Sequence, residues 1–119
     1  MLKIFIVIPA YNEEKVIGKV ISDIKKEGYR NIIVVDDGSV DKSSEVAKKE
    51  GATVLRHVLN RGKGASTKTG LEYAKLKNAD TVVTFDGDGQ HNPKDIKKMI
   101  KKINDGYEVV LGSRFLNKK

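Results

Sequence analysis

Residues 4–14 read IFIVIPAYNEE, and this stretch decides how the rest of the chain is interpreted. Ile4 to Pro9 form an apolar, largely β-branched run that is typical of a buried strand. No cleavage-site pattern follows the run, which favours a strand over a signal peptide and predicts that the mature protein starts at Met1. Apolar residues then recur at helical spacing, at Val16, Ile17, Val20, Ile21 and Ile24, and Gly28 supplies a stop. A buried strand followed directly by a helix is how a βαβ unit begins.

Apolar runs alternate with helical patterns through the whole chain. Five runs are expected to be strands: Ile4 to Pro9, Asn31 to Asp36, Ala52 to Arg56, Thr81 to Asp86 and Glu108 to Gly112. Three further helical patterns cover Ser43 to Glu50, Ala65 to Lys77 and Pro93 to Asp105. This alternation predicts an α/β fold with a mostly parallel sheet and helices on both faces. The length of 119 residues predicts one domain, spanning residues 1–119.

The composition excludes several classes of protein. The chain is 39% hydrophobic and 33% charged, with no apolar run long enough for a membrane span and no cysteine. The lack of cysteine excludes disulfides, thiolate zinc sites and cysteine nucleophiles, and makes the cytoplasm the expected compartment. The net charge of +7 is concentrated in residues 41–119. It favours an anionic partner, such as a nucleotide, a phosphate, a nucleic acid or a lipid head group.

Polar loops follow the predicted strands. They read PAYNE from Pro9, DDGS from Asp36, NRGKG from Asn60, DGDGQ from Asp86 and GSR from Gly112. In an open parallel sheet, ligands bind outside the carboxyl ends of the strands. We therefore expect these loops to gather carboxylates, glycines and cations at one edge of the sheet.

Two acidic pairs lie in these loops. Asp86 and Asp88 flank Gly87, and such carboxylates repel each other unless a cation or proton lies between them. Oxygen ligands suit Mg²⁺ or Mn²⁺, and the alternative is a solvated turn. Asp37 is expected to face the ligand and accept hydrogen bonds from a nucleobase or ribose, with helix capping as the alternative. For Asp36, ligand contact and a packing or capping role are equally open.

The NRGKG loop places Arg61 and Lys63 just before a predicted helix, whose free backbone amides favour anions. Its spacing is that of neither a Walker loop nor a dinucleotide-binding GxGxxG, and a plain flexible loop is the alternative. Spacing also argues against a calcium loop that starts at Asp86, because His91 stands where such a loop needs glycine. His57 is expected to be structural or to face solvent.

The last predicted helix has two different faces. Ile96, Met99, Ile100 and Ile103 share one face, while Lys94, Lys97, Lys98, Lys101 and Lys102 share the opposite one. The lysine face is a solvated surface or a contact for anionic lipid or nucleic acid. No aromatic residues interleave with the lysines, which argues against nucleic acid as a partner because bases would have no platform for stacking.

Five motifs occur in order along the chain: VIPAYNEE at 7–14, IIVVDDGSVD at 32–41, NRGKGAS at 60–66, TFDGDGQHNP at 84–93 and VVLGSRF at 109–115. Together they strongly resemble family 2 glycosyltransferases of the GT-A fold, with the closest likeness to the dolichol-phosphate mannosyltransferase group. The resemblance spans nearly the whole chain. Members of that group continue beyond the GSR motif into an acceptor-binding half, so this chain is expected to be essentially the donor-binding half.

The resemblance implies a role for each matching residue. Pro9, Tyr11, Glu13, Val35 and Asp37 are expected to line the nucleotide pocket. The resemblance also implies that Asp86, Gly87 and Asp88 hold the sugar diphosphate through Mg²⁺ or Mn²⁺, with Gln90 as a further metal ligand. It implies in addition that Arg114 faces the transferred phosphate or the acceptor. Lys63 joins the substrate-binding set, and Asp88 and Arg114 form the catalytic set.

The resulting functional hypothesis is an inverting, metal-dependent transferase. Its donor is expected to be GDP-mannose or a UDP-sugar, and its acceptor a polyprenyl phosphate reached from the cytoplasmic membrane surface. The alternative is a module that binds nucleotide or nucleotide-sugar without turnover. A donor half alone would expose an apolar edge, which makes a homo-oligomer one expected state.

Overall fold

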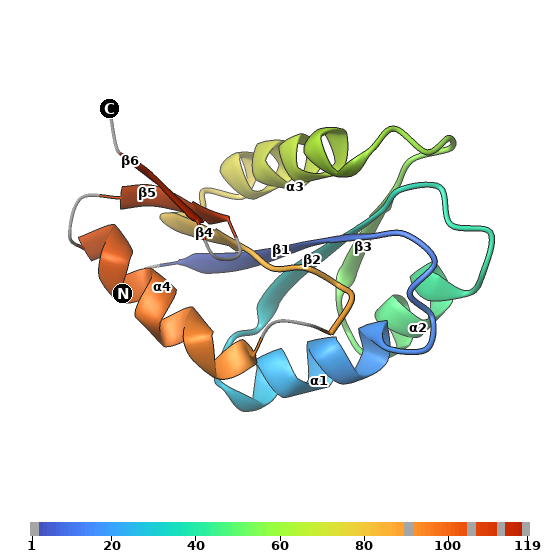
Figure 1. The fold of residues 1–119 in the computed structure, drawn as a ribbon, viewed down its shortest axis with the longest axis horizontal. Helices are drawn as coiled ribbons and strands as arrows, with labels where there is room; N and C mark the ends of the chain where they lie inside the picture. The colour runs from blue at the N-terminus through green and yellow to red at the C-terminus, as the bar shows by residue number, and fades with distance from the viewer. Residues whose placement is uncertain (1–2, 90–91, 105–106, 112–113, 118–119) are drawn as a thin grey trace.

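A single sheet of six strands, in the order β3-β2-β1-β4-β5-β6, runs through the middle of the molecule (Figure 1). The computed structural model describes residues 3–89, 92–104, 107–111 and 114–117, with side chains as far as Lys101. The parallel strands are β1 (Ile4–Ala10), β2 (Asn31–Asp36), β3 (Thr53–Arg56), β4 (Thr81–Thr84) and β5 (Tyr107–Leu111). Strand β6 (Arg114–Asn117) pairs antiparallel with β5. The predicted α/β fold with a mostly parallel sheet is confirmed.

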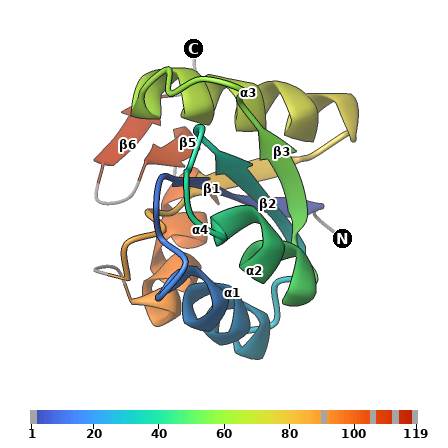
Figure 2. The same cartoon turned by 90° about the vertical axis from the view of Figure 1, so that its right-hand side faces the viewer.

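Helices cover both faces of the sheet, as Figures 1 and 2 show. Helix α3 (Lys63–Leu76) covers one face alone. The other face carries α1 (Ile17–Lys26), α2 (Ser43–Lys49) and α4 (Ile96–Asn104), the last preceded by the 3₁₀ turn η1 (Pro93–Asp95). No helix in the described ranges has the length and apolar character that crossing a bilayer requires.

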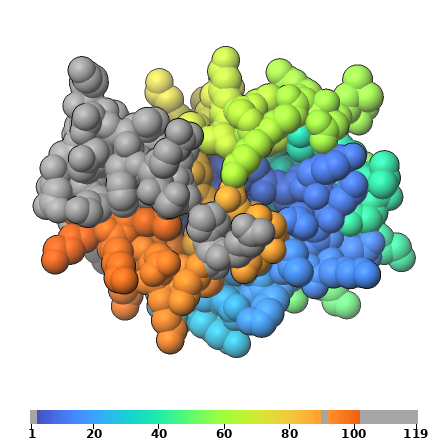
Figure 3. Space-filling model, viewed as in Figure 1, coloured from blue at the N-terminus to red at the C-terminus, as the bar shows by residue number. Residues whose placement is uncertain are grey.

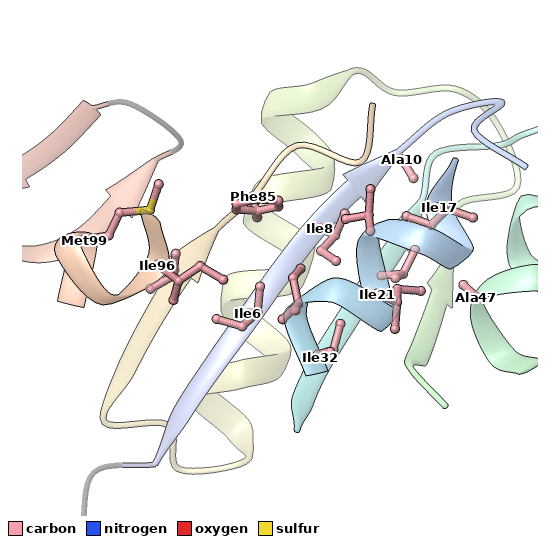
Figure 4. Packing of buried hydrophobic residues seen from close by; sticks show 14 residues of the cluster. Ile6, Ile8, Ala10, Ile17, Ile21, Ile32, Ala47, Phe85, Ile96 and Met99 are labelled. Carbon is pink, nitrogen blue, oxygen red and sulfur yellow. The ribbon is translucent and has the colours of Figure 1, made fainter. Parts of the chain in front are cut away.

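Side chains from the two faces of β1 pack into two separate hydrophobic cores, because successive side chains of a strand point to opposite sides of the sheet. Ile6 and Ile8 pack with the inward faces of α1 and α4, where Ile21 and Ile96 are fully buried (Figure 4). Phe5 and Val7 point the other way, toward Ala74 of α3. Burying both faces explains why the central strands read as continuous apolar runs rather than alternating ones.

Helix α3 lies unusually close to the sheet at Gly70. A Cβ atom built at this position would lie 2.3 Å from Cγ1 of Val7 and 3.2 Å from Cγ2 of Val35. No side chain fits in that space, so the glycine permits the close contact. This contact places the first turn of α3 beside the carboxyl end of β2.

Four of the five predicted strands, all but β2, have bounds one or two residues away from the prediction, and β6 is an additional strand. The fourth strand ends at Thr84 rather than Asp86, although the N–H of Phe85 still donates to the carbonyl of Val7 at 2.8 Å. Strand β6 was not predicted, because RFLN is too short to display an alternating pattern and its pairing depends on where β5 lies.

Candidate functional site

The loops that follow β1, β2 and β4 meet the first turn of α3 at the carboxyl edge of the sheet, which faces the viewer in Figure 2. They enclose a pocket of about 310 Å³. Its described lining consists of Pro9, Ala10, Tyr11, Glu13, Asp37, Asn60, Gly62, Lys63, Ser66, Asp86, Gly87 and Asp88. Segments far apart in the sequence thus contribute to one site, at the place where the polar loops predicted it.

Val35 does not belong to this described lining. Its side chain is fully buried and packs with Val7 and Ala74 in the core beneath α3. The reason is the alternation of β2: Val35 points toward α3, and the chain leaves the strand only after Asp36. The structure therefore brings Pro9, Tyr11, Glu13 and Asp37 together without the Val35 side chain.

Hydrogen bonds between loops hold the segment with Tyr11 and Glu13 in place. The amide of Asn12 donates to Oγ of Ser39 at 2.8 Å, and the amide of Glu13 donates to Oγ of Ser43 at 2.8 Å. In return, the side-chain oxygen of Asn12 accepts the amide of Val40 at 2.9 Å. The short polar residues that follow β2 thus brace the loop that follows β1.

Asp36 has a structural role. It is fully buried, its Oδ1 accepts the amide of Ser39 at 2.9 Å, and its Oδ2 accepts the hydroxyl of Ser44. A guanidinium nitrogen of Arg56 lies 3.6 Å from the same Oδ2. Of the two roles that the sequence left open, the geometry supports packing and capping.

Asp37 lines the pocket and also organises the loop before α3. Its Oδ1 accepts the amide of Arg61 at 2.8 Å, and its Oδ2 accepts the amide of Gly62 at 2.7 Å. Nδ1 of His57 lies 2.8 Å from Oδ1, and Nε2 of the same ring lies 2.8 Å from Oγ1 of Thr69. Burial opposes ionisation of Asp37, but the hydrogen bonds from His57, Arg61 and Gly62 outweigh it and lower the pKa of the carboxyl.

His57 is accordingly structural, which is one of its two predicted environments. Its ring is buried and connects the end of β2 to α3 through Asp37 and Thr69. No spacing rule in the sequence pairs these three residues.

The DGD segment comes directly after β4. Oδ1 of Asp86 forms an ion pair with Nζ of Lys63 at 2.5 Å, which joins the NRGKG loop to the predicted diphosphate site. Gly87 is buried, and a Cβ atom there would lie 3.2 Å from both Cγ2 of Ile8 and the carbonyl oxygen of Pro9. A glycine therefore lets this segment pack against the end of β1.

Negative charge accumulates at the mouth of the pocket. Burial raises the pKa of Glu13, and the negative charges of Asp88 and Asp41 raise it further. The negative charge of Asp88 is thus close enough to oppose the ionisation of Glu13. A bound cation would relieve that repulsion.

The donor set fits a hard divalent cation in its chemistry, since Asp86 and Asp88 offer carboxylate oxygens on one short segment. Within the ranges that the structure describes, no three carboxylate or imidazole residues converge closely enough to complete a metal site by themselves. Gln90, the predicted third ligand, lies outside the described residues. Arg114 begins β6, and only its backbone is described.

The predicted site residues did not include Ala10, Asn60, Gly62 and Ser66, which belong to the described lining. Ser66 is fully buried in the first turn of α3, where its hydroxyl donates to the carbonyl of Gly62 at 3.1 Å. Its place within the NRGKGAS motif is a signal that could have found it.

The chain matches the model of a known protein family and is similar in sequence to several known proteins. Residues 5–119 match the model of the family described as glycosyl transferase family 2. An uncharacterized protein of Methanocaldococcus jannaschii is 54% identical over 98% of this chain and 48% of its own length. The UDP-N-acetylglucosamine–dolichyl-phosphate N-acetylglucosaminyltransferase of Methanococcus voltae is 42% identical, over 98% of this chain and 53% of its own. The dolichol-phosphate mannosyltransferase of Pyrococcus furiosus is 32% identical, over 97% of this chain and 34% of its own.

The fold of the chain is also similar to that of a solved structure. Glucosyl-3-phosphoglycerate synthase of Mycobacterium tuberculosis, in complex with Mn²⁺, UDP-glucose and phosphoglyceric acid, superimposes with a TM-score of 0.71 and 26% identity. The match covers 86% of this chain and 39% of the synthase. The present chain spans about half the length, or less, of these proteins.

Proposed function

Because the chain belongs to glycosyl transferase family 2 and has the GT-A fold, we propose that its pocket binds a nucleoside diphosphate sugar together with a divalent cation. The sugar would be transferred, with inversion, to a polyprenyl phosphate. The observation that carries the proposal is the convergence of Glu13, Asp37, Lys63, Asp86 and Asp88 in one pocket at the carboxyl edge of the sheet.

The donor is proposed to lie across the pocket from the β1 and β2 loops to the DGD segment. Pro9, Tyr11, Glu13 and Asp37 would contact the nucleoside. The diphosphate would lie against Gly87 and beside Lys63, where the first turn of α3 adds free amides that favour an anion.

Asp86 and Asp88 are the described residues proposed to hold the cation, with Gln90 as their third partner. When bound, Mg²⁺ or Mn²⁺ supplies positive charge that stabilises the departing diphosphate. Lys63 contributes a second positive charge at the same place. Lys63 forms an ion pair with Asp86, so we expect a bound diphosphate to compete with Asp86 for the ammonium group of Lys63.

The transfer breaks the bond between the anomeric carbon and the donor phosphate oxygen. An oxygen of the acceptor phosphate forms the new bond from the opposite face of the sugar, and the nucleoside diphosphate leaves. A phosphate acceptor is already ionised near neutral pH, so the reaction needs no strong general base. Arg114 is proposed to face the acceptor phosphate.

Calorimetric titration with UDP-N-acetylglucosamine, UDP-glucose and GDP-mannose, with and without Mn²⁺, tests the proposal. We expect one donor to bind only when the cation is present. Asp88→Ala should weaken that binding by roughly ten- to 100-fold, because a charge-assisted contact contributes about 1.5–3 kcal/mol. Asp23→Ala removes an exposed aspartate of α1 and should leave the affinity unchanged.

Equal affinities for the donor in the parent and in Asp88→Ala would refute the assignment of the DGD segment. A second assay supplies dolichyl phosphate in vesicles and follows the release of nucleoside diphosphate. Donor binding without release under these conditions would instead identify a binding module without turnover.

A further inference from the structure

The outward side of α4 carries a row of lysines that no part of the proposed reaction uses. Lys94, Lys97, Lys98 and Lys101 are exposed, whereas Ile96 and Met99 on the opposite side are 0% and 7% exposed. Spacings of three and four residues place the four lysines on one side of the helix. We call these four residues the lysine stripe.

Within η1 and α4, lysines outnumber acidic residues. Residues 93–104 contain five lysines and one acidic residue, Asp95. The described contact between stripe and acid is weak, since Nζ of Lys98 lies 3.9 Å from Oδ1 of Asp95 and the Lys98 side chain is 84% exposed. Within α4, Lys97 and Lys101 are like charges four residues apart, which destabilises a helix. An anionic surface laid along the stripe would remove this repulsion.

The stripe lies on the outer surface of the molecule. In Figure 3 the side chains of residues 92–101, in orange, project from its lower edge. The described part of the helix presents no aromatic side chain among these lysines, so the stripe offers charge but no stacking platform. Charge without stacking suits the head groups of an anionic bilayer better than the bases of a nucleic acid.

The stripe is also close to the pocket along the chain. Lys94 follows Asp88 by six residues, and η1 immediately precedes α4. Docking of the stripe on a bilayer would hold the whole domain at the surface where a lipid-linked acceptor carries its phosphate.

We propose that the lysine stripe docks this protein electrostatically on an anionic lipid bilayer. The inference rests on the proposed function, because a lipid-linked acceptor is what makes residence at a bilayer useful. The partner is the negatively charged lipid surface itself rather than one particular lipid.

Vesicle sedimentation tests the docking with the full chain. The vesicles contain phosphatidylcholine alone or with about 30% phosphatidylglycerol, a lipid whose charge attracts basic segments. The variant is K97Q/K98Q/K101Q, which removes charge and keeps side-chain length. The control K48Q/K49Q/K75Q removes the same charge from exposed positions of α2 and α3. Thermal unfolding of each variant verifies the fold.

We expect the parent and the control to bind only the anionic vesicles, and to release them at high salt because ions screen the attraction. The stripe variant should bind roughly 100-fold more weakly, since each lysine near such a surface contributes roughly fivefold. No binding by the parent, or equal losses in both variants, would overturn the docking site. So would tighter, stripe-dependent binding to single-stranded RNA than to vesicles.

Donor titration of the same samples separates this inference from the proposed function. A stripe variant that binds donor normally but not vesicles supports both. Loss of donor binding in every sample would contradict the proposed function, while the vesicle result would still decide the role of the stripe.

Discussion

Asp37 shows how one carboxylate can serve both the fold and the site. The amides of Arg61 and Gly62 and the ring of His57 use its two oxygens, and the residue still lines the pocket. The shape of the pocket wall at Gly62 and Lys63 therefore depends on Asp37. Any contact that Asp37 makes to a nucleoside will be made by a carboxylate already fixed in orientation.

Replacing Asp37 by Asn should lower the free energy of unfolding by about 1–3 kcal/mol, because at least one partly buried hydrogen bond, from the amide of Arg61 or Gly62, loses its acceptor. The pKa of Asp37 is lowered in the fold. Its stabilising effect is therefore complete above the unfolded value of about 3.9 and is lost as the pH falls through the folded value. Urea unfolding at several pH values checks this prediction.

The difference between the parent and Asp37→Asn should be constant near neutral pH and shrink below about pH 4. Glu72→Gln is the matched control, because Glu72 is an exposed carboxylate of α3. A difference that grew on acidification would contradict the assigned role of the Asp37 carboxylate.

Helix α3 is the element on which the site depends most. Its first turn supplies Lys63 and Ser66 to the pocket, and its middle touches the sheet at Gly70. Few large apolar side chains hold this helix: Ala74 is buried, and Tyr73 is partly buried against the same core. The small residues on its inner side bring the helix near enough to the sheet for its first turn to reach Asp86.

Replacing Gly70 by Ala should destabilise the protein by about 1–3 kcal/mol, although alanine favours helices over glycine. The added methyl would overlap the Val7 side chain, so α3 must move away from the sheet. Gly64→Ala in the same helix is the control, because a Cβ atom there meets nothing within 4 Å. This control should be neutral or stabilising by about 0.5 kcal/mol. If urea unfolding gave both variants the same stability, the close contact at Gly70 would be wrong.

At the scale of the whole molecule, the pocket exists only when the chain is folded. Its walls come from segments near residues 9–13, 37, 60–66 and 86–88, which the sheet order places side by side. A ligand of this pocket binds the native state and not the unfolded chain. Binding must therefore raise global stability.

The donor that binds in calorimetry should raise the Tm when Mn²⁺ is present. At a concentration of 100 times its Kd, the stabilisation is about 2.7 kcal/mol. For a chain of this size that corresponds to a rise of roughly 10 °C. Thermal unfolding with donor plus EDTA should show little of this rise, and Asp88→Ala should show at most about half of it. An equal rise in EDTA would argue against a cation in the site.

The predictions from sequence succeeded where the evidence was local. The strand at Ile4, the helix that includes Ile17 and Ile21, and the polar loops at strand ends were all readable from periodicity. The PAYNE, DDGS, NRGKG and DGD loops are indeed gathered at one edge, with Asp86 and Asp88 in the same pocket as Glu13. Gly112 and Ser113 of the GSR loop lie outside the described residues. The predicted roles of Gln90 and Arg114 stay predictions, because the side chains of both lie outside the described residues.

The sequence by itself determined the fold class and the chemistry at the site. Consecutive apolar residues predict a buried strand. An acidic pair predicts a site rich in oxygen ligands, independent of where the pair lies in the fold. Only the tertiary structure decided which polar residues serve the ligand and which serve the fold. Asp36 and Asp37 are adjacent residues of the same type. Asp36 is buried and accepts a hydrogen bond from Ser44, whereas Asp37 lines the pocket. The reason is physical: the alternation of β2 and the closeness of α3 at Gly70 determine what each side chain meets, and both depend on contacts distant in sequence.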